Sequence, residues 1–140
     1  MLFRSSQLDS LVARARAAGL PVTVTVTGAE RALPPEVDQA AYRIVQEALT
    51  NVSRHAGQAS ASVHLHYTPD VLSVQVDDDG AGAGGSNGSR PAGPGLGLIG
   101  MRERVTALGG RLHAGPRVKG DGAAGGGFRV RAELPARAPS

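Results

Sequence analysis

Four polar side chains with the means to bind a nucleotide fall on one stretch of predicted helix: Glu47, Asn51, Arg54 and His55. At about 100° per residue, they occupy a stripe roughly 100° wide. An apolar stripe adjoins it, so the polar set borders the core, where a cleft could open. The alternative is an ordinary amphipathic helix whose polar face carries Glu–Asn–Arg pairs. This segment alone leaves both interpretations open.

A second segment runs from an apolar strand into three acids, Asp77, Asp78 and Asp79, and then into two spaced glycines, Gly80 and Gly82. A carboxylate at a strand end can accept a hydrogen bond from an exocyclic amine such as that of adenine, and the glycines let a ring approach the backbone. Adjacent like charges are unfavourable, so something should compensate for them. A simple Asp-Gly turn is the alternative.

A third segment is a glycine run in which Gly95, Gly97 and Gly100 match the spacing of a dinucleotide-binding fingerprint. That fingerprint must directly follow a strand within a βαβ unit, whereas here a long Gly/Ser/Pro loop precedes it. What remains is a set of free backbone N–H groups that leads into a helix N-terminus, which is an arrangement suited to anions.

In this order, the three segments resemble the nucleotide-binding motifs of sensor histidine kinases. Glu47–Ala56 is similar to their N box, Asp78–Gly82 to their first glycine box, and Gly95–Val105 to their second. The Gly-Met-Arg-Glu-Arg-Val ending resembles the nitrate-sensor-type subfamily. The resemblance extends from about Leu8 to Pro135. It implies a GHKL (Bergerat) fold that holds Mg-ATP between a helix layer and a mobile lid at about residues 83–94.

The resemblance also implies a role for each motif residue. Asp78 would accept the adenine amino group, beside which Gly80 and Gly82 leave room for the ring. Asn51 would ligate a Mg²⁺ that bridges the phosphates, and Glu47 would polarise the attacking group or order a metal-bound water. The remaining residues implied in ATP binding are Arg54, His55, Gly95, Gly97, Leu98, Gly100 and Met101.

In such kinases the phosphoryl group passes to a histidine on a dimerisation domain. None of His55, His64, His66 and His113 lies on a leading helix beside an acidic residue. We therefore expect residues 1–140 to be a single catalytic domain that lies in the cytoplasm. Its parent kinase is expected to supply the phosphoacceptor domain and to signal to a response regulator of the helix-turn-helix output type. The alternatives are an anti-sigma-factor serine kinase and a nucleotide-sensing module that transfers no phosphate.

The composition of the chain excludes some classes of partner and of metal site. The chain has 140 residues, 15 Lys and Arg against 12 Asp and Glu, and 3% aromatic residues. So few aromatics provide no base-stacking platform, and we expect no direct contact with nucleic acid or membrane. The chain has no cysteine, which excludes disulfides and thiolate metal sites.

Hydrophobic periodicity predicts the elements that position these motifs. Helices are expected at about 6–18, from Pro34–Pro35 to about His55, and at about 101–108. Strands are expected at 22–27, 60–67, 71–77, and near 111–114 and 128–134, with residues 119–126 as a wide hairpin connection. This order predicts an α+β two-layer sandwich with helices on one face, and the resemblance implies that its sheet is mixed.

Overall fold

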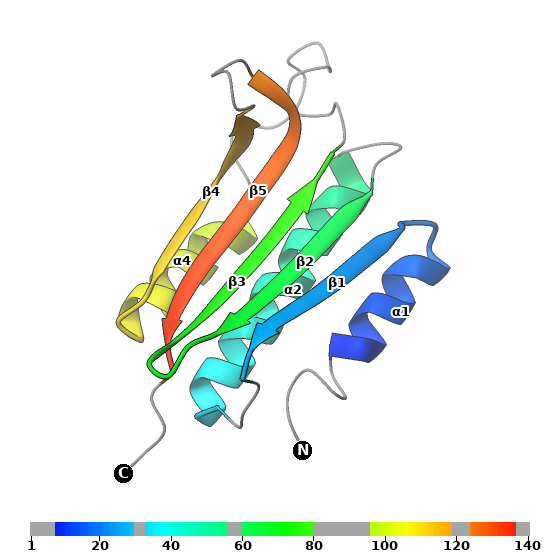
Figure 1. The fold of residues 1–140 in the computed structure, drawn as a ribbon. Helices are drawn as coiled ribbons and strands as arrows, with labels where there is room; N and C mark the ends of the chain where they lie inside the picture. Colours follow the sequence, from blue (N-terminus) through cyan, green and yellow to red (C-terminus); the bar gives the residue numbers. More distant parts are fainter. Residues whose placement is uncertain (1–7, 30–32, 56–59, 80–95, 119–123, 137–140) are drawn as a thin grey trace.

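The computed structural model describes residues 8–29, 33–55, 60–79, 96–118 and 124–136. Within these described residues, three helices and five strands follow one another (Figure 1). In order they are α1 (Asp9–Ala17), β1 (Val22–Gly28), α2 (Pro35–His55), β2 (Ala61–Tyr67), β3 (Val71–Asp78), α4 (Leu96–Ala107), β4 (Arg111–Val118) and β5 (Ala124–Pro135).

The five strands form one sheet in the order β1-β2-β3-β5-β4. β1 pairs with β2 in parallel, and the other three pairings are antiparallel. β2 and β3 are joined by a turn at Thr68–Asp70, where the Thr68 N–H donates to the Val71 carbonyl at 2.9 Å. The sheet is therefore mixed, as the family resemblance implied.

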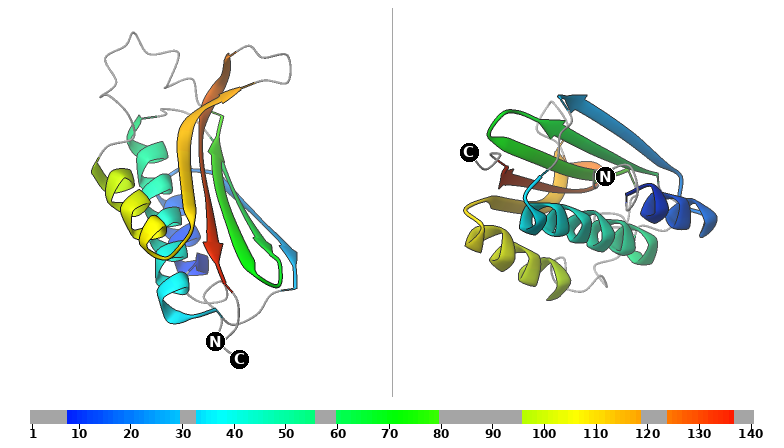
Figure 2. Two further views of the ribbon diagram at one scale, coloured as in Figure 1. Left: turned by 90° about the vertical axis from the view of Figure 1, so that its left-hand side faces the viewer. Right: turned by 90° about the horizontal axis from the view of Figure 1, so that it is seen from below.

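Helices cover one face of this sheet, and none of the described helices covers the other, which we call the uncovered face (Figure 2, left). α2 begins at Pro35, a residue suited to the first helical position, and carries Glu36 and Asp38 in its first turn, where they complement the helix dipole. Its predicted apolar stripe is buried: Ala41, Ile44, Val45, Ala48 and Val52 are each at most 5% exposed. The α+β two-layer prediction is confirmed.

Three element boundaries differ from the sequence prediction by four residues or more. β4 ends at Val118, four residues beyond its expected end. α4 begins at Leu96, five residues before the expected start, so Gly97 and Gly100 lie inside a helix and not in a loop before it. Glycine costs about 1 kcal/mol in a helix interior, but α4 packs against α2 and β4 and buries Val105 completely. β5 begins at Ala124, so the end of the expected hairpin connection is strand.

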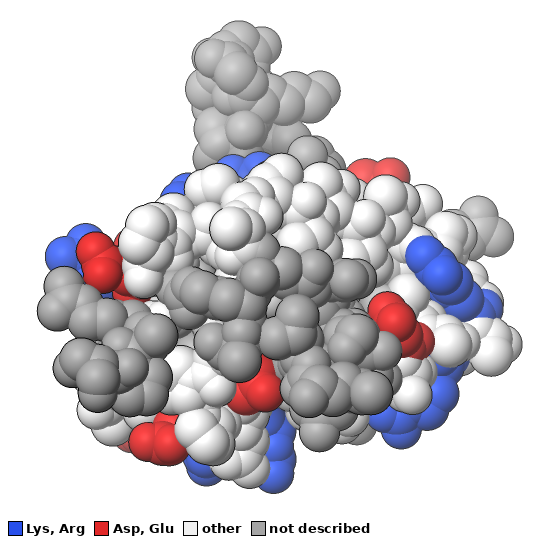
Figure 3. Space-filling view, turned by 60° about the horizontal axis from the view of Figure 1, so that its bottom comes forward, with Lys and Arg blue, Asp and Glu red and all other residues white. Residues whose placement is uncertain are grey.

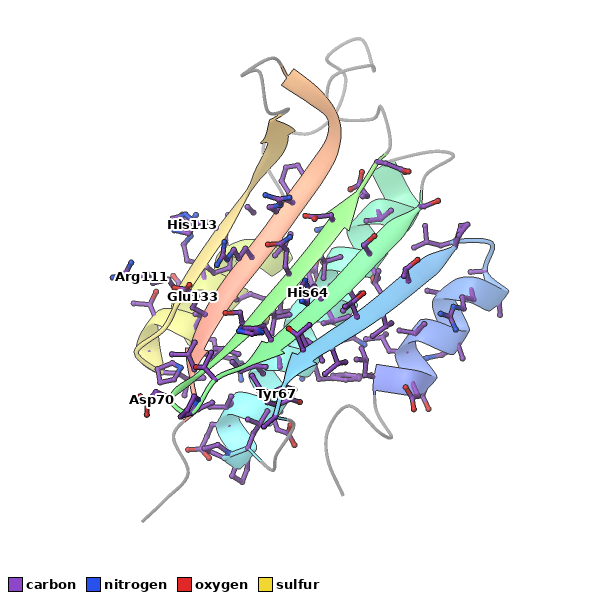
Figure 4. All side chains as sticks on the ribbon, in the orientation of Figure 1. His64, Tyr67, Asp70, Arg111, His113 and Glu133 are labelled. Atoms are coloured by element: carbon purple, nitrogen blue, oxygen red, sulfur yellow. The ribbon has the colours of Figure 1, made fainter. Side chains whose placement is uncertain are left out.

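The uncovered face of the sheet is polar. Along β2, Ala61, Val63, Leu65 and Tyr67 are buried, while the alternate residues Ser62, His64 and His66 are exposed. Arg111 and His113 of β4 are likewise exposed (Figure 4). In the view of Figure 3, basic and acidic side chains are interspersed. Among the described helices, none has both the length and the apolar character needed to cross a membrane.

Candidate functional site

The three consecutive carboxylates at the end of β3 have three different environments. Asp78 continues the buried series of Leu72, Val74 and Val76 on the helix-covered face and is only 7% exposed. Among the described residues, it is the one buried charged side chain. Of the three carboxylates, Asp78 is thus the one that faces the helix layer.

The carboxylates on either side are compensated by neighbouring strands. Asp77 accepts a hydrogen bond from Arg129 Nε on β5 at 2.7 Å, and this interaction raises the pKa of Arg129. Asp79 Oδ1 accepts the Ser60 backbone N–H at 2.7 Å, and the Asp79 N–H donates back to the Ser60 carbonyl at 3.2 Å. The repulsion between adjacent carboxylates is thus compensated as the sequence led us to expect. Arg129 on β5 compensates Asp77, and the backbone of Ser60, just before β2, compensates Asp79.

Gly127 on β5 lies against the backbone of Asp78. It has φ +101°, and a Cβ placed there would lie 1.9 Å from the Asp78 carbonyl oxygen. Only glycine fits this contact. β5 therefore contributes to the position of Asp78 through close backbone approach, a role that the sequence did not suggest.

α2 brings its polar stripe to the same end of the molecule. Glu47 and Asn51 are one turn apart and half-buried, which places both on one side of the helix. α2 packs on β3, and both elements run toward the upper end in Figure 1, where each of them terminates. Since Asp78 lies on the face that α2 covers, the end of β3 and the last turns of α2 border the same region between the two layers.

Several predicted site residues lie outside the described part of the chain. They include Gly80, Gly82, Gly95 and the expected lid at about 83–94. Arg54 and His55 close α2, and Gly97 and Leu98 open α4, but the side chains at these positions are also outside the described part. Gly100 is exposed, and no described atom beyond its own helix backbone and chain neighbours lies within 4 Å of the position that a Cβ would take. Met101 is half-buried.

A cavity of about 420 Å³ lies elsewhere, at the N-terminal end of α2, where Pro35, Asp38, Gln39, Tyr42 and Arg43 line it. Asp38 Oδ1 is buried there and has no hydrogen-bond partner among the residues that the structure describes. Burial raises the pKa of the Asp38 carboxyl above its ordinary value. This cavity is at the opposite end of α2 from Asn51, so it is separate from the predicted nucleotide site.

Sequence reasoning missed three residues that shape the site: Ser60, Gly127 and Arg129. Ser60 contacts the Asp77–Asp79 segment from the position before β2, and Gly127 and Arg129 contact it from β5. The one available signal is the Gly-Gly-Gly run that ends at Gly127, whose first two glycines fall in the connection predicted at residues 119–126. Their roles depend on strand pairing between segments about 20 to 50 residues apart, which local sequence patterns do not encode.

The comparison with protein families finds a match over residues 36–138 to the family described as "Histidine kinase-, DNA gyrase B-, and HSP90-like ATPase". The matched region includes α2, β3 and α4, the elements that carry the three motifs. It covers more than half of the chain.

Curated relatives and solved structures agree with this match. The chain is 36% identical over 95 residues to the sensor histidine kinase LnrJ of Bacillus subtilis, covering 68% of this chain and 22% of that protein. It is 42% identical over 77 residues to the sensor histidine kinase NarS of Mycobacterium tuberculosis, covering 54% and 18%. The chain thus spans about a fifth of the length of these relatives. A structure of the mycobacterial sensor histidine kinase MprB has the same fold, with a TM-score of 0.66 at 22% identity over 96% of this chain and 97% of that one.

Proposed function

The chain belongs to the histidine kinase-, DNA gyrase B-, and HSP90-like ATPase family, and from this premise we propose that it binds Mg-ATP and transfers the γ-phosphoryl group to a histidine on a separate dimerisation domain. It is the catalytic ATPase domain of a sensor histidine kinase. The observation that supports the proposal most is the placement of Asp78, a buried carboxylate at the end of β3 on the face covered by α2.

The nucleotide base is the part of the ligand that Asp78 would recognise. Its carboxylate would accept the adenine amino group, and Gly80 and Gly82, which follow it directly, would let the ring lie close to the chain. A charge-assisted hydrogen bond of this kind contributes about 1.5–3 kcal/mol. It also discriminates against guanine, which presents a carbonyl oxygen where adenine presents the amine.

The donor set on α2 fits magnesium. Asn51 supplies an amide oxygen and Glu47 a carboxylate one turn earlier, and Mg²⁺ prefers oxygen ligands while keeping several waters. The ion would neutralise negative charge on the phosphates. Asn51 would hold it, and Glu47 would orient a metal-bound water or polarise the attacking group. Arg54, His55 and the segment from Gly95 to Met101 would complete the contacts to sugar and phosphates.

Catalysis in this proposal is positioning plus charge neutralisation, because this chain supplies no covalent intermediate. Residues at about 83–94 would close over the phosphates and exclude water. Residues 1–140 act as one domain in the cytoplasm, where ATP is available. The parent kinase supplies the phosphoacceptor histidine and signals to a response regulator with helix-turn-helix output.

Replacement of Asn51 by alanine is expected to remove the magnesium dependence of nucleotide binding. Wild-type affinity for a non-hydrolysable ATP analogue should rise at least tenfold when Mg²⁺ is added, and Asn51→Ala should lose most of this gain. Calorimetric titration with and without Mg²⁺ measures both values. Thr50→Ala, an exposed neighbour on the same helix, is the matched control and should behave as wild type. An undiminished magnesium effect in Asn51→Ala would assign the ion to other residues.

Phosphoryl transfer is tested by mixing this chain and Mg-ATP with the dimerisation domain of its parent kinase. Phosphohistidine is labile in acid and stable in base, whereas phosphoserine is stable in acid and labile in base. We expect label on the dimerisation domain that acid removes, and none after its acceptor histidine is changed to glutamine. Acid-stable label on a serine would support a serine kinase instead, and binding without any transfer would support a nucleotide sensor.

A further inference from the structure

Two histidines on the uncovered face of the sheet direct ring nitrogens at a single point. His64 and His66 are alternate residues of β2 and both are exposed. His64 Nε2 lies 3.2 Å from Thr27 Oγ1, and His66 Nδ1 lies 2.5 Å from the same oxygen. The two nitrogens are thus separated by no more than the sum of these distances.

The strand register explains why different nitrogens meet there. Thr27 of β1 pairs directly with His66, so the near nitrogen of that ring, Nδ1, reaches the hydroxyl. His64 pairs with Thr25, one step further along the face, and only its far nitrogen, Nε2, extends to the same place. The convergence is therefore fixed by the pairing of β1 with β2 and by the side-chain alternation along β2.

We propose that His64 and His66 form a binding site for a divalent transition-metal ion, with zinc as the representative, beside the Thr27 hydroxyl. Neutral imidazole is a preferred ligand of zinc, copper and nickel, with Zn–N distances of about 2.0–2.1 Å. Small rotations of two exposed rings bring both nitrogens to such distances from one ion. The Thr27 hydroxyl, which contacts both nitrogens without metal, stays at hand as a weak ligand or as a partner for a metal-bound water.

The character of the site follows from its composition. Among the described residues, no group of three or more His, Cys, Asp or Glu gathers where it could hold a metal, so two imidazoles carry the binding and water fills the other positions. Such a site is open and exchanges its ion readily. It is chemically distinct from the proposed magnesium position, because Mg²⁺ prefers oxygen ligands. It also lies on the opposite face of the sheet from α2 (Figure 2, left).

The test is a zinc titration of the full chain in the presence of excess Mg²⁺. Calorimetry measures the zinc affinity, and NMR monitors the signals of the histidine rings during the titration. His64→Gln and His66→Gln should each weaken zinc binding at least tenfold, because one imidazole alone loses the chelate. His113→Gln is the matched control. It removes another exposed histidine (Figure 4), but β3 and β5 lie between β4 and β2, which separates it by about 14 Å.

His113→Gln should leave zinc affinity within about twofold of wild type. Shifts of the His64 and His66 ring signals at the same zinc concentration would support the site directly. Unchanged affinity in both His64→Gln and His66→Gln, or equal losses in all three variants, would overturn it. The readout does not involve nucleotide, so the result is independent of whether this chain binds ATP.

Discussion

Asp78→Asn is expected to weaken binding of an ATP analogue by on the order of 100-fold, while the fold stays intact. The substitution keeps the size of the side chain but exchanges a charged acceptor for a neutral amide, and the loss of a charge-assisted hydrogen bond costs about 1.5–3 kcal/mol. The amide also presents an N–H₂ group where the adenine amine needs an acceptor. Calorimetric titration with the analogue gives the affinity, and thermal unfolding monitored by circular dichroism tests the fold.

Asp77→Asn provides a matched control one residue away. The chemical change is identical, but Asp77 is bound to Arg129 on the uncovered face, with the side chains 16% and 46% exposed. Such surface ion pairs contribute up to about 1 kcal/mol to stability, and nucleotide affinity should not change. A second readout is selectivity: Asp78→Asn should reduce the preference for adenine over guanine analogues, and Asp77→Asn should retain it. Wild-type affinity in Asp78→Asn, or equal losses in both variants, would contradict the assignment of the adenine contact.

The elements around the site were predictable where local signals were strong. The Pro34–Pro35 start and the apolar stripe predicted α2, and the Val/Thr alternation from Val22 to Thr27 predicted β1. Gly109–Gly110 ended α4 close to the predicted position, and Gly109 adopts φ +87° directly after the helix. These features depend on neighbouring residues, which a single sequence shows.

The start of α4 and the surroundings of Asp78 were not predictable for two different reasons. Gly97 and Gly100 favour a loop by propensity, but packing of α4 against α2 and β4 outweighs that preference. The contacts of Ser60, Gly127 and Arg129 with the three acids arise only when β3 lies between β2 and β5. That the motifs share a site stays a prediction, which the family resemblance implies, whereas the strand contacts around Asp78 have no signal in a single sequence.

The contact between Gly127 and Asp78 leads to the second large effect. Gly127→Ala should destabilise the domain by about 3 kcal/mol or more. An alanine at φ +101° is strained by roughly 1–2 kcal/mol, and its Cβ would lie 1.9 Å from the Asp78 carbonyl oxygen, so β3 or β5 must move. Because that movement displaces Asp78, nucleotide affinity should fall as well. Urea unfolding monitored by circular dichroism gives the free energy of unfolding.

Gly19→Ala separates backbone strain from collision. Gly19 has nearly the same conformation, φ +100°, but no atom lies within 4 Å of the position that its Cβ would take. It should therefore lose only the strain energy, roughly 1–2 kcal/mol, and keep wild-type nucleotide affinity. The difference between the two variants measures the cost of moving the Asp78 backbone. Equal destabilisation by both substitutions would mean that β5 shifts at Gly127 without a cost in free energy. The close approach of Gly127 would then have no part in holding Asp78 in place.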